Sequence, residues 1–190
     1  MMLNTVILLI DFRGHPILGD DYVNNHRYGE IQRLMLRNSG KVKKEDILFV
    51  SNNGAGYDKK LNELFKMAEL INFNTLQLSE NYDGDYTVDE IIDIIFKMTG
   101  YKIDSKFTQI IIGGCNLGGC VTNAKNISAI NWSKLNFKTT IHLPLCAEYE
   151  QPGSNQVERV CGGFREMYTI IRDNKAFDIR VTDHIKQLKI

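Results

Sequence analysis

The stretch QIIIGGCNLGGCVTNA, Gln109–Ala124, combines a short apolar run with two pairs of glycines and two cysteines. Its apolar part, Ile110–Ile112, is β-branched and bounded by turn residues, which is typical of a fully buried strand. Glycines directly after a strand permit positive φ or a close approach of the backbone to another group. The small and apolar residues after Cys120 then indicate a helix. The stretch therefore predicts a strand, a glycine-rich turn and a helix in succession.

Cys120 is expected at or near the N-terminus of that helix. Backbone N–H groups and the helix dipole favour a thiolate there, and the thiolate is the nucleophilic form of cysteine. A free cysteine is also among the most often buried residue types, so a space-filling role for Cys120 stays open. Cys115 leaves two more interpretations open, a redox pair with Cys120 or half of a zinc site. Cys146 and Cys161 are not spaced like the second half of such a site.

The rest of the chain alternates apolar strands with amphipathic helices. Strands are predicted over Thr5–Ile10, Ile47–Ser51, Thr75–Ser79, Thr139–Leu143 (closed by Pro144) and Ala176–Val181, and helices over Asp21–Asn38, Lys59–Ile71, Val88–Met98 and Asn155–Arg172. Thr87 with Glu90 is a capping-box pattern. Strands that alternate with helices imply βαβ units. We therefore predict a single domain over residues 1–190, a three-layer α/β/α sandwich with a mostly parallel six-stranded sheet.

Ligands of such sheets bind outside the carboxyl ends of the strands. Four features follow strands and are expected on this rim: Asp11, Asn52, Glu80 and the Cys115–Cys120 loop. Asp11 could act as a base toward Cys120, while backbone N–H groups of the turn, with Asn116 and Gly119 in it, stabilise an oxyanion. A cap that closes the first strand is the other interpretation of Asp11.

Composition narrows the function classes. Lys+Arg and Asp+Glu balance at 23 each, so no net field favours nucleic acid or an anionic membrane. We interpret Arg27, Arg33 and Arg37 as a solvated helix face. The opening residues lack the basic region and cleavage site of a signal peptide, and no apolar run approaches a membrane span of about 18 residues. Four cysteines in 190 residues then favour reduced thiols and a cytoplasmic location.

Two motifs resemble those of the isochorismatase-like cysteine hydrolases. LLIDF, Leu8–Phe12, matches an apolar strand that ends in Asp and an aromatic residue. GCNLGGCV, Gly114–Val121, matches a nucleophile loop in which a Cys-Val pair opens a helix. The resemblance covers nearly the whole chain and implies a parallel six-stranded sheet and a homodimer or larger homo-oligomer. It implies a hydrolase of a small amide or vinyl-ether-like substrate, with Cys120 as nucleophile, Asp11 as base and no cofactor.

The sequence departs from the family's pattern at three places. Leu117 replaces a loop Thr, Arg13 replaces a Gln or Asn, and the Lys that follows the third strand falls at Ser79 or Glu80. Without that Lys, a thiolate at Cys120 loses a stabilising positive charge. The carboxylate of Glu80 would disfavour the thiolate further. Arg13 could replace the charge. The alternative is a catalytically lapsed member that binds a small molecule or a protein partner.

The resemblance also bears on substrate and metal contacts. Arg13, Glu80 and Asn52 are the candidate substrate-binding residues on the rim. Nicotinamidase-like members of the family bind a metal through an Asp-x-His pattern with a further His. The four histidines of this chain do not show that spacing. We therefore predict no metal.

Overall fold

The computed structural model describes residues 1–11, 21–40, 43, 46–52, 59–71, 73–78, 86–147, 156–174 and 178–183. Its strands are β1 Thr5–Ile10, β2 Ile47–Ser51, β3 Asn74–Gln77, β4 Gln109–Cys115, β5 Lys138–Ala147 and β6 Ile179–Thr182. Its helices are α1 Asp21–Asn38, α2 Lys59–Leu70, α3 Val88–Thr99, η1 Leu117–Ala124, α4 Ala129–Lys134 and α5 Gln156–Asp173. The six strands form one sheet in the order β3-β2-β1-β4-β5-β6, and every pair is parallel.

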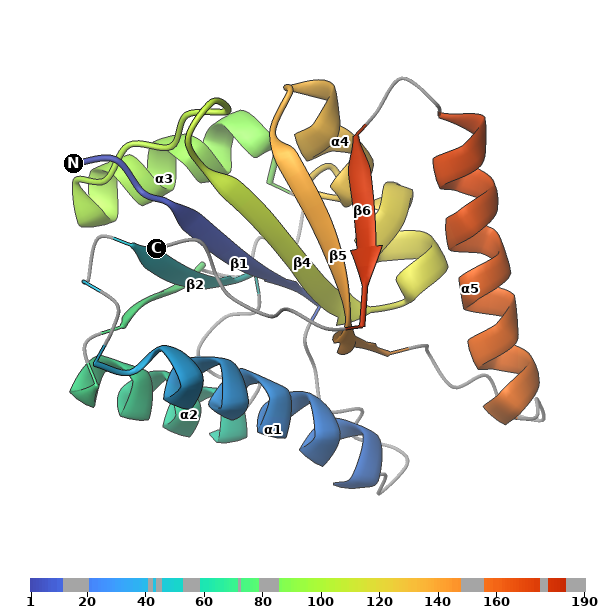
Figure 1. Cartoon of the computed structure of the whole chain (residues 1–190), viewed down its shortest axis with the longest axis horizontal. Coiled ribbons are helices and arrows are strands. Elements are labelled where there is room, and N and C mark those ends of the chain that lie inside the picture. The colour runs from blue at the N-terminus through green and yellow to red at the C-terminus, as the bar shows by residue number, and fades with distance from the viewer. Residues whose placement is uncertain are drawn as a thin grey trace.

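Helices cover both faces of the sheet, as the sequence predicts. Figure 1 shows α1 and α2 on one side and α3, α4 and α5 on the other. Every side chain of β1 is buried, and alternate residues enter different cores. Ile7 and Leu9 pack with α1 and α2, whereas Leu8 and Ile10 pack toward α3 and α4. Burial on both faces explains why this strand is a continuous apolar run in the sequence.

Local signals fix the ends of several elements. The bounds of β1, β2 and α1 agree with the predicted ones. At the start of α3 the Thr87 side chain accepts a hydrogen bond from the Glu90 N–H at 3.3 Å, and the Glu90 carboxylate accepts from the Thr87 N–H at 2.7 Å. The predicted capping box is confirmed.

The prediction that Pro144 ends the fifth strand is wrong. β5 continues to Ala147, and its pairing with β4 shifts register between Ile112 and Gly114. Proline is tolerated in a strand where the ladder is irregular, because the missing N–H then breaks no regular hydrogen bond. The strand therefore runs past the proline to the rim of the sheet.

β1 and β4 approach each other closely at their carboxyl ends. Ile10 is paired with Gly114, whose φ is +155°. A Cβ at Gly114 would lie 1.9 Å from the carbonyl oxygen of Ile10, so no larger residue fits without moving a strand. This contact brings the residue after β1 next to the loop after β4.

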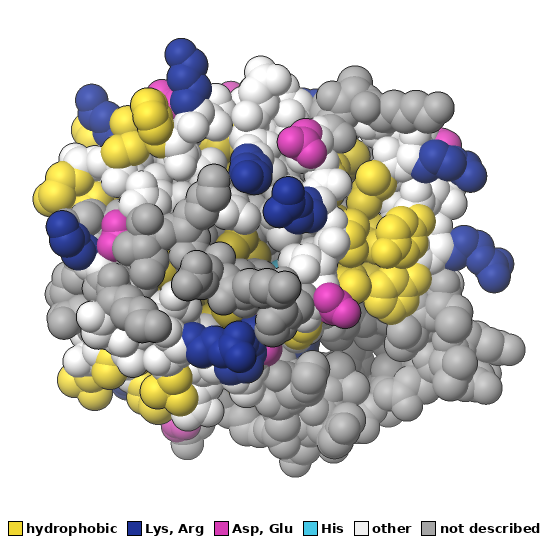
Figure 2. Space-filling view, in the orientation of Figure 1, with side chains coloured by type: hydrophobic (Ala, Val, Ile, Leu, Met, Phe, Trp, Pro, Cys, Tyr) yellow, Lys and Arg dark blue, Asp and Glu magenta, His cyan; other side chains and the backbone are white. Residues whose placement is uncertain are grey.

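The surface drawn in Figure 2 carries basic and acidic side chains interspersed with one another. Apolar side chains gather between β6 and α5. Among the described side chains of these two elements, Phe164, Ile171, Ile179 and Val181 are half-buried and pack against the core. Among the described residues, no helix is both long enough and apolar enough to cross a membrane.

Candidate active site

Asp11 directly follows β1 and is held in an unusual conformation. Its φ is +47°, in the left-handed region that non-glycine residues seldom adopt, and only 8% of its surface is exposed. Asn52 at the end of β2 holds it in place with both ends of its side-chain amide. The Asn52 Oδ1 accepts from the Asp11 N–H at 2.7 Å, and the Asn52 Nδ2 donates to the Asp11 Oδ1 at 3.2 Å. Strained backbone that its surroundings enforce is typical of functional sites.

The helix that carries Cys120 is a π-helix. The Val121 N–H donates to the carbonyl of Asn116 at 3.2 Å, and the Thr122 hydroxyl donates to the carbonyl of Leu117 at 2.5 Å, both five residues back. Cys120 lies in the first turn and is half-buried, so its predicted place near a helix N-terminus is confirmed. The wider turn is a difference from the ordinary helix that the sequence suggests. π-helical turns occur frequently at functional sites.

Asn116 shapes the loop that leads into η1. Its own φ is +60°, and its Oδ1 accepts from the Gly119 N–H at 2.9 Å. The two predicted loop residues are therefore bonded to each other. In this arrangement the Gly119 N–H is engaged within the loop, while its predicted part in an oxyanion hole stays a prediction.

Lys125 joins the end of η1 to Asp11. Its Nζ lies 3.8 Å from the Asp11 Oδ2, and its side chain is 27% exposed. We call Asp11, Asn52 and Lys125 the rim cluster. Lys125 is not among the residues predicted from sequence, because the resemblance implies a cation after the third strand and not after the helix that carries Cys120. The signal available was the spacing Cys120-x4-Lys125, which matters only once the helix is known to be π.

The predicted site residues thus fall into two groups. Asp11, Asn52 and the end of η1 meet on one rim, as expected for strand ends of a parallel sheet. Arg13 and Glu80 lie outside the described residues, as does Ser79. Asp11 is linked to the segment of Cys120 through Lys125, five residues further along the chain.

Cys115, the last residue of β4, contacts a residue of α1. Its thiol accepts a hydrogen bond from the Arg27 guanidinium at 3.1 Å, and both residues are buried. The interpretation of Arg27 as part of a solvated face is therefore wrong, because α1 turns that residue toward β4. Cys115, Cys120 and Cys146 are not joined in disulfides. Among the described residues, no group of three or more His, Cys, Asp or Glu side chains could hold a metal ion.

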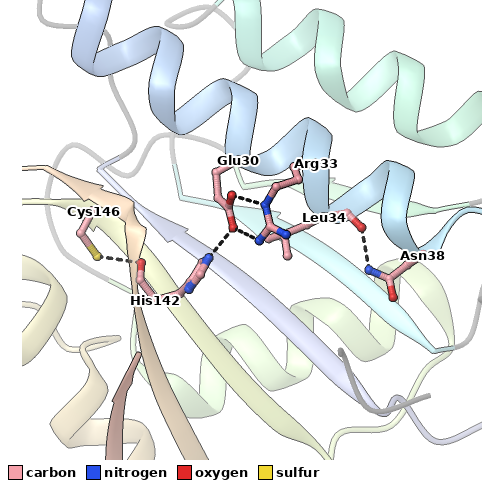
Figure 3. A network of polar contacts seen from close by, with 6 residues as sticks. All are labelled: Glu30, Arg33, Leu34, Asn38, His142 and Cys146. Atoms are coloured by element: carbon pink, nitrogen blue, oxygen red, sulfur yellow. Dashed lines mark hydrogen bonds and ion pairs between the residues drawn. The ribbon is translucent and has the colours of Figure 1, made fainter. Parts of the chain in front are cut away.

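A second polar cluster lies between α1 and β5. Figure 3 shows Glu30 and Arg33 of α1 beside His142 of β5, and we call these three residues the α1–β5 cluster. The His142 Nε2 lies 2.6 Å from the Glu30 Oε1, and Arg33 bonds the same carboxylate with two nitrogens. The Cys146 thiol donates to the backbone carbonyl of His142 at 3.3 Å.

Burial sets the ionisation of the α1–β5 cluster. Desolvation lowers the pKa of His142 below its ordinary value, although Glu30 and the backbone of Thr182 act in the opposite direction. Desolvation also opposes ionisation of Glu30, but hydrogen bonds from Arg33 and His142 outweigh it and lower the pKa of Glu30. Glu30 is therefore charged at neutral pH and His142 is neutral.

Comparisons with known proteins point to the fold. No protein-family model matches the chain, and no curated protein matches it. Among solved structures, the crystal structure of the nicotinamidase SaPncA from Staphylococcus aureus is similar, with a TM-score of 0.58 and 14% sequence identity. The alignment covers 97% of this chain and 100% of that one. The predicted α/β class is confirmed: over nearly its whole length, this chain has the isochorismatase-like fold of a nicotinamidase.

Proposed function

We propose that the protein is a cysteine-dependent hydrolase of the isochorismatase-like type, acting on a small amide or vinyl-ether-like substrate. Cys120 is the nucleophile and Asp11 the base. The observation that carries the proposal is the state of Asp11. A buried carboxylate in a left-handed conformation, clamped by Asn52 and paired with a lysine of the Cys120 segment, is costly to maintain as a mere strand cap.

For an amide, the reaction proceeds through a thioester. Asp11 takes the thiol proton of Cys120, and the sulfur bonds to the carbonyl carbon while the carbonyl oxygen becomes an oxyanion. Backbone N–H groups at the start of η1 stabilise that oxyanion. The C–N bond then breaks, and the nitrogen leaves with the proton from Asp11. In the second half, Asp11 takes a proton from water, the hydroxide adds to the thioester, and the C–S bond breaks to release the acid and restore the thiol.

The remaining rim residues take supporting roles. The amide oxygen and the amide nitrogen of Asn52 both bond to Asp11, so we assign Asn52 to positioning the base and not to binding the substrate. Arg13 and Glu80 stay candidates for substrate contact. The predicted homo-oligomer and cytoplasmic location also stay predictions, and sedimentation of the purified chain measures the first of them.

The test is release of ammonia from a panel of small primary amides, with nicotinamide as the first probe because the similar structure is a nicotinamidase. Cys120→Ser should lower turnover about a thousandfold or more, since the attacking sulfur is lost. Cys146→Ser is the matched control, because a hydroxyl keeps the donor to the His142 carbonyl. Full turnover by Cys120→Ser would exclude the mechanism.

The second candidate is a catalytically lapsed protein that binds a small molecule or a protein partner. The observation that favours it is the absence of a lysine at Ser79 and Glu80. Thiol reactivity separates the two candidates. An activated Cys120 should react with iodoacetamide well below the ordinary thiol pKa of about 8.5. A lapsed site should show the ordinary profile, and peptide mass spectrometry identifies which cysteine reacts.

A further inference from the structure

We propose that Lys125 supplies the positive charge of the active site, holding Asp11 in place and favouring the thiolate of Cys120. The inference rests on the proposed function. It concerns a residue that sequence reasoning did not single out, on the same helix as the nucleophile. In this proposal Lys125, and not Arg13, replaces the positive charge of the missing lysine.

The first support is the environment of Asp11. The residue is 8% exposed and its side chain 11% exposed, and a carboxylate charge in such a place needs a compensating charge. Among the residues that the structure describes, Lys125 is the only cation paired with it. The Asn52 amide fixes one oxygen, Oδ1, while Lys125 lies nearest the other, Oδ2. The two partners therefore fix the carboxylate from two directions.

The second support is the geometry of η1. The backbone hydrogen bond from the Val121 N–H to the Asn116 carbonyl spans five residues, as it does in a π-helix. Lys125 follows Cys120 by five residues and ends the helix with extended backbone, at φ −97° and ψ 148°. It therefore lies one turn beyond the sulfur. In an ordinary α-helix, residues five apart do not share a face.

The third support is chemical. An ammonium has three N–H donors on a flexible stem, so contact with one carboxylate does not saturate it. The separation of 3.8 Å from the Asp11 Oδ2 is that of an ion pair and longer than a hydrogen bond. In the proposed arrangement the ammonium pairs with the Asp11 carboxylate at rest and stabilises the Cys120 thiolate once the proton has moved from sulfur to Asp11. Lys125 is accordingly a positioning residue for Asp11 and an electrostatic partner of Cys120.

The experiment measures the alkylation rate of Cys120 by iodoacetamide between pH 5 and 10, with each cysteine followed separately by peptide mass spectrometry. Lys125→Met should raise the midpoint of the pH profile by about one unit, which lowers the rate about tenfold at pH values well below both midpoints. Lys125→Arg should retain the low midpoint because it keeps the charge. Lys97→Met, which removes a lysine from the exposed side of α3, is the control and should leave the profile unchanged.

The outcomes separate this inference from the proposed function. A low midpoint in the unmodified protein that rises in Lys125→Met and is rescued in Lys125→Arg supports both. A low midpoint that Lys125→Met leaves in place overturns the role of Lys125 while the hydrolase proposal stands. An ordinary midpoint in the unmodified protein overturns the hydrolase proposal and this inference with it. A lower melting temperature with an unmoved midpoint shows a merely structural lysine and also overturns the inference.

Discussion

The rim cluster and the α1–β5 cluster are both built from a carboxylate, a basic side chain and a neutral hydrogen-bonding partner. They differ in where they lie along the strands. Asp11 and Asn52 follow the ends of β1 and β2, whereas His142 lies within β5 and faces α1. They differ also in backbone, because Asp11 has a positive φ while Glu30 and Arg33 belong to a regular helix.

Under the proposed function, this difference separates polar groups that stabilise the fold from polar groups that take part in the reaction. In the α1–β5 cluster the charges of Glu30 and Arg33 and the imidazole of His142 bond one another, and burial keeps the imidazole neutral. In the rim cluster the Lys125 side chain is instead 27% exposed, and it follows the half-buried Cys120 by five residues. We therefore expect substitutions in the first cluster to act on stability and those in the second to act on reactivity.

The largest expected effect comes from Gly114, which lets β4 approach β1 beneath the rim cluster. Gly114→Ala should lower the free energy of unfolding by about 4 kcal/mol or more, because a Cβ meets the Ile10 carbonyl at 1.9 Å and φ is +155°. Chemical denaturation measures the change. The control is Gly162→Ala in α5, where a Cβ meets nothing within 4 Å and about 0.5–1 kcal/mol of stabilisation is expected. Equal stabilities for the two variants would contradict the close approach.

The next effect tests the α1–β5 cluster. Glu30→Ala should cost about 2–3 kcal/mol of stability, since it removes the shared partner of Arg33 and His142. Urea unfolding measures the loss, and Glu63→Ala on the exposed side of α2 is the control. The alkylation profile of Cys120 should not change in folded Glu30→Ala. A shifted profile would mean that the two clusters are coupled.

Substitution of Asn52 separates effects on the free energy of unfolding from effects on turnover. Asn52→Ala should cost about 1–2 kcal/mol and lower turnover about 100-fold, because Asp11 loses both of its bonds to the amide. Asn4→Ala removes a similar Asn–Asp bond, of 2.9 Å to Asp46, near the amino end of β1. It should cost a similar amount of stability and leave turnover intact. Equal turnover by the Asn52→Ala and Asn4→Ala variants would show that Asn52 does not contribute to catalysis.

The smallest effect is a pH dependence of stability from His142. Its pKa is lowered in the folded protein by burial, so the unfolded chain binds more protons as the pH falls through about 6.5, the ordinary value for histidine. Stability should therefore decrease between pH 7 and 5. The lowered pKa of Glu30 extends the loss below pH 4.5. His142→Gln should make the slope between pH 7 and 5 shallower, as measured by denaturation at each pH, and an unchanged slope would assign it to other groups.

The sequence predicts the parts of the fold that depend on local patterns. Continuous apolar runs locate β1 and β2, and helical periodicity locates α3. The end of β5 is not predictable in this way, because the irregular pairing with β4 lets Pro144 stay in the strand. The helix α4 is not predicted from the sequence, because its six residues are too few to show a periodic pattern.

The candidate site is predictable only where it follows the strand order. Asp11 and Asn52 meet because the carboxyl ends of parallel strands share an edge. Lys125 and Arg27 depend instead on how helices turn over the sheet, which spacing along the chain does not reveal. Arg27 resembles its solvated neighbours in sequence, yet it donates to a buried thiol.

The wide turn of η1 makes this segment sensitive to the insertion or deletion of a single residue. An ordinary helix closes its hydrogen bonds over four residues and this one over five, so a single codon separates the two forms. Cys120 and Lys125 both lie within the short segment 116–125, so an insertion or deletion inside it changes how the thiol and the ammonium are placed relative to each other. Deleting one residue between Cys120 and Lys125 should therefore rotate the ammonium away from the Asp11 carboxylate.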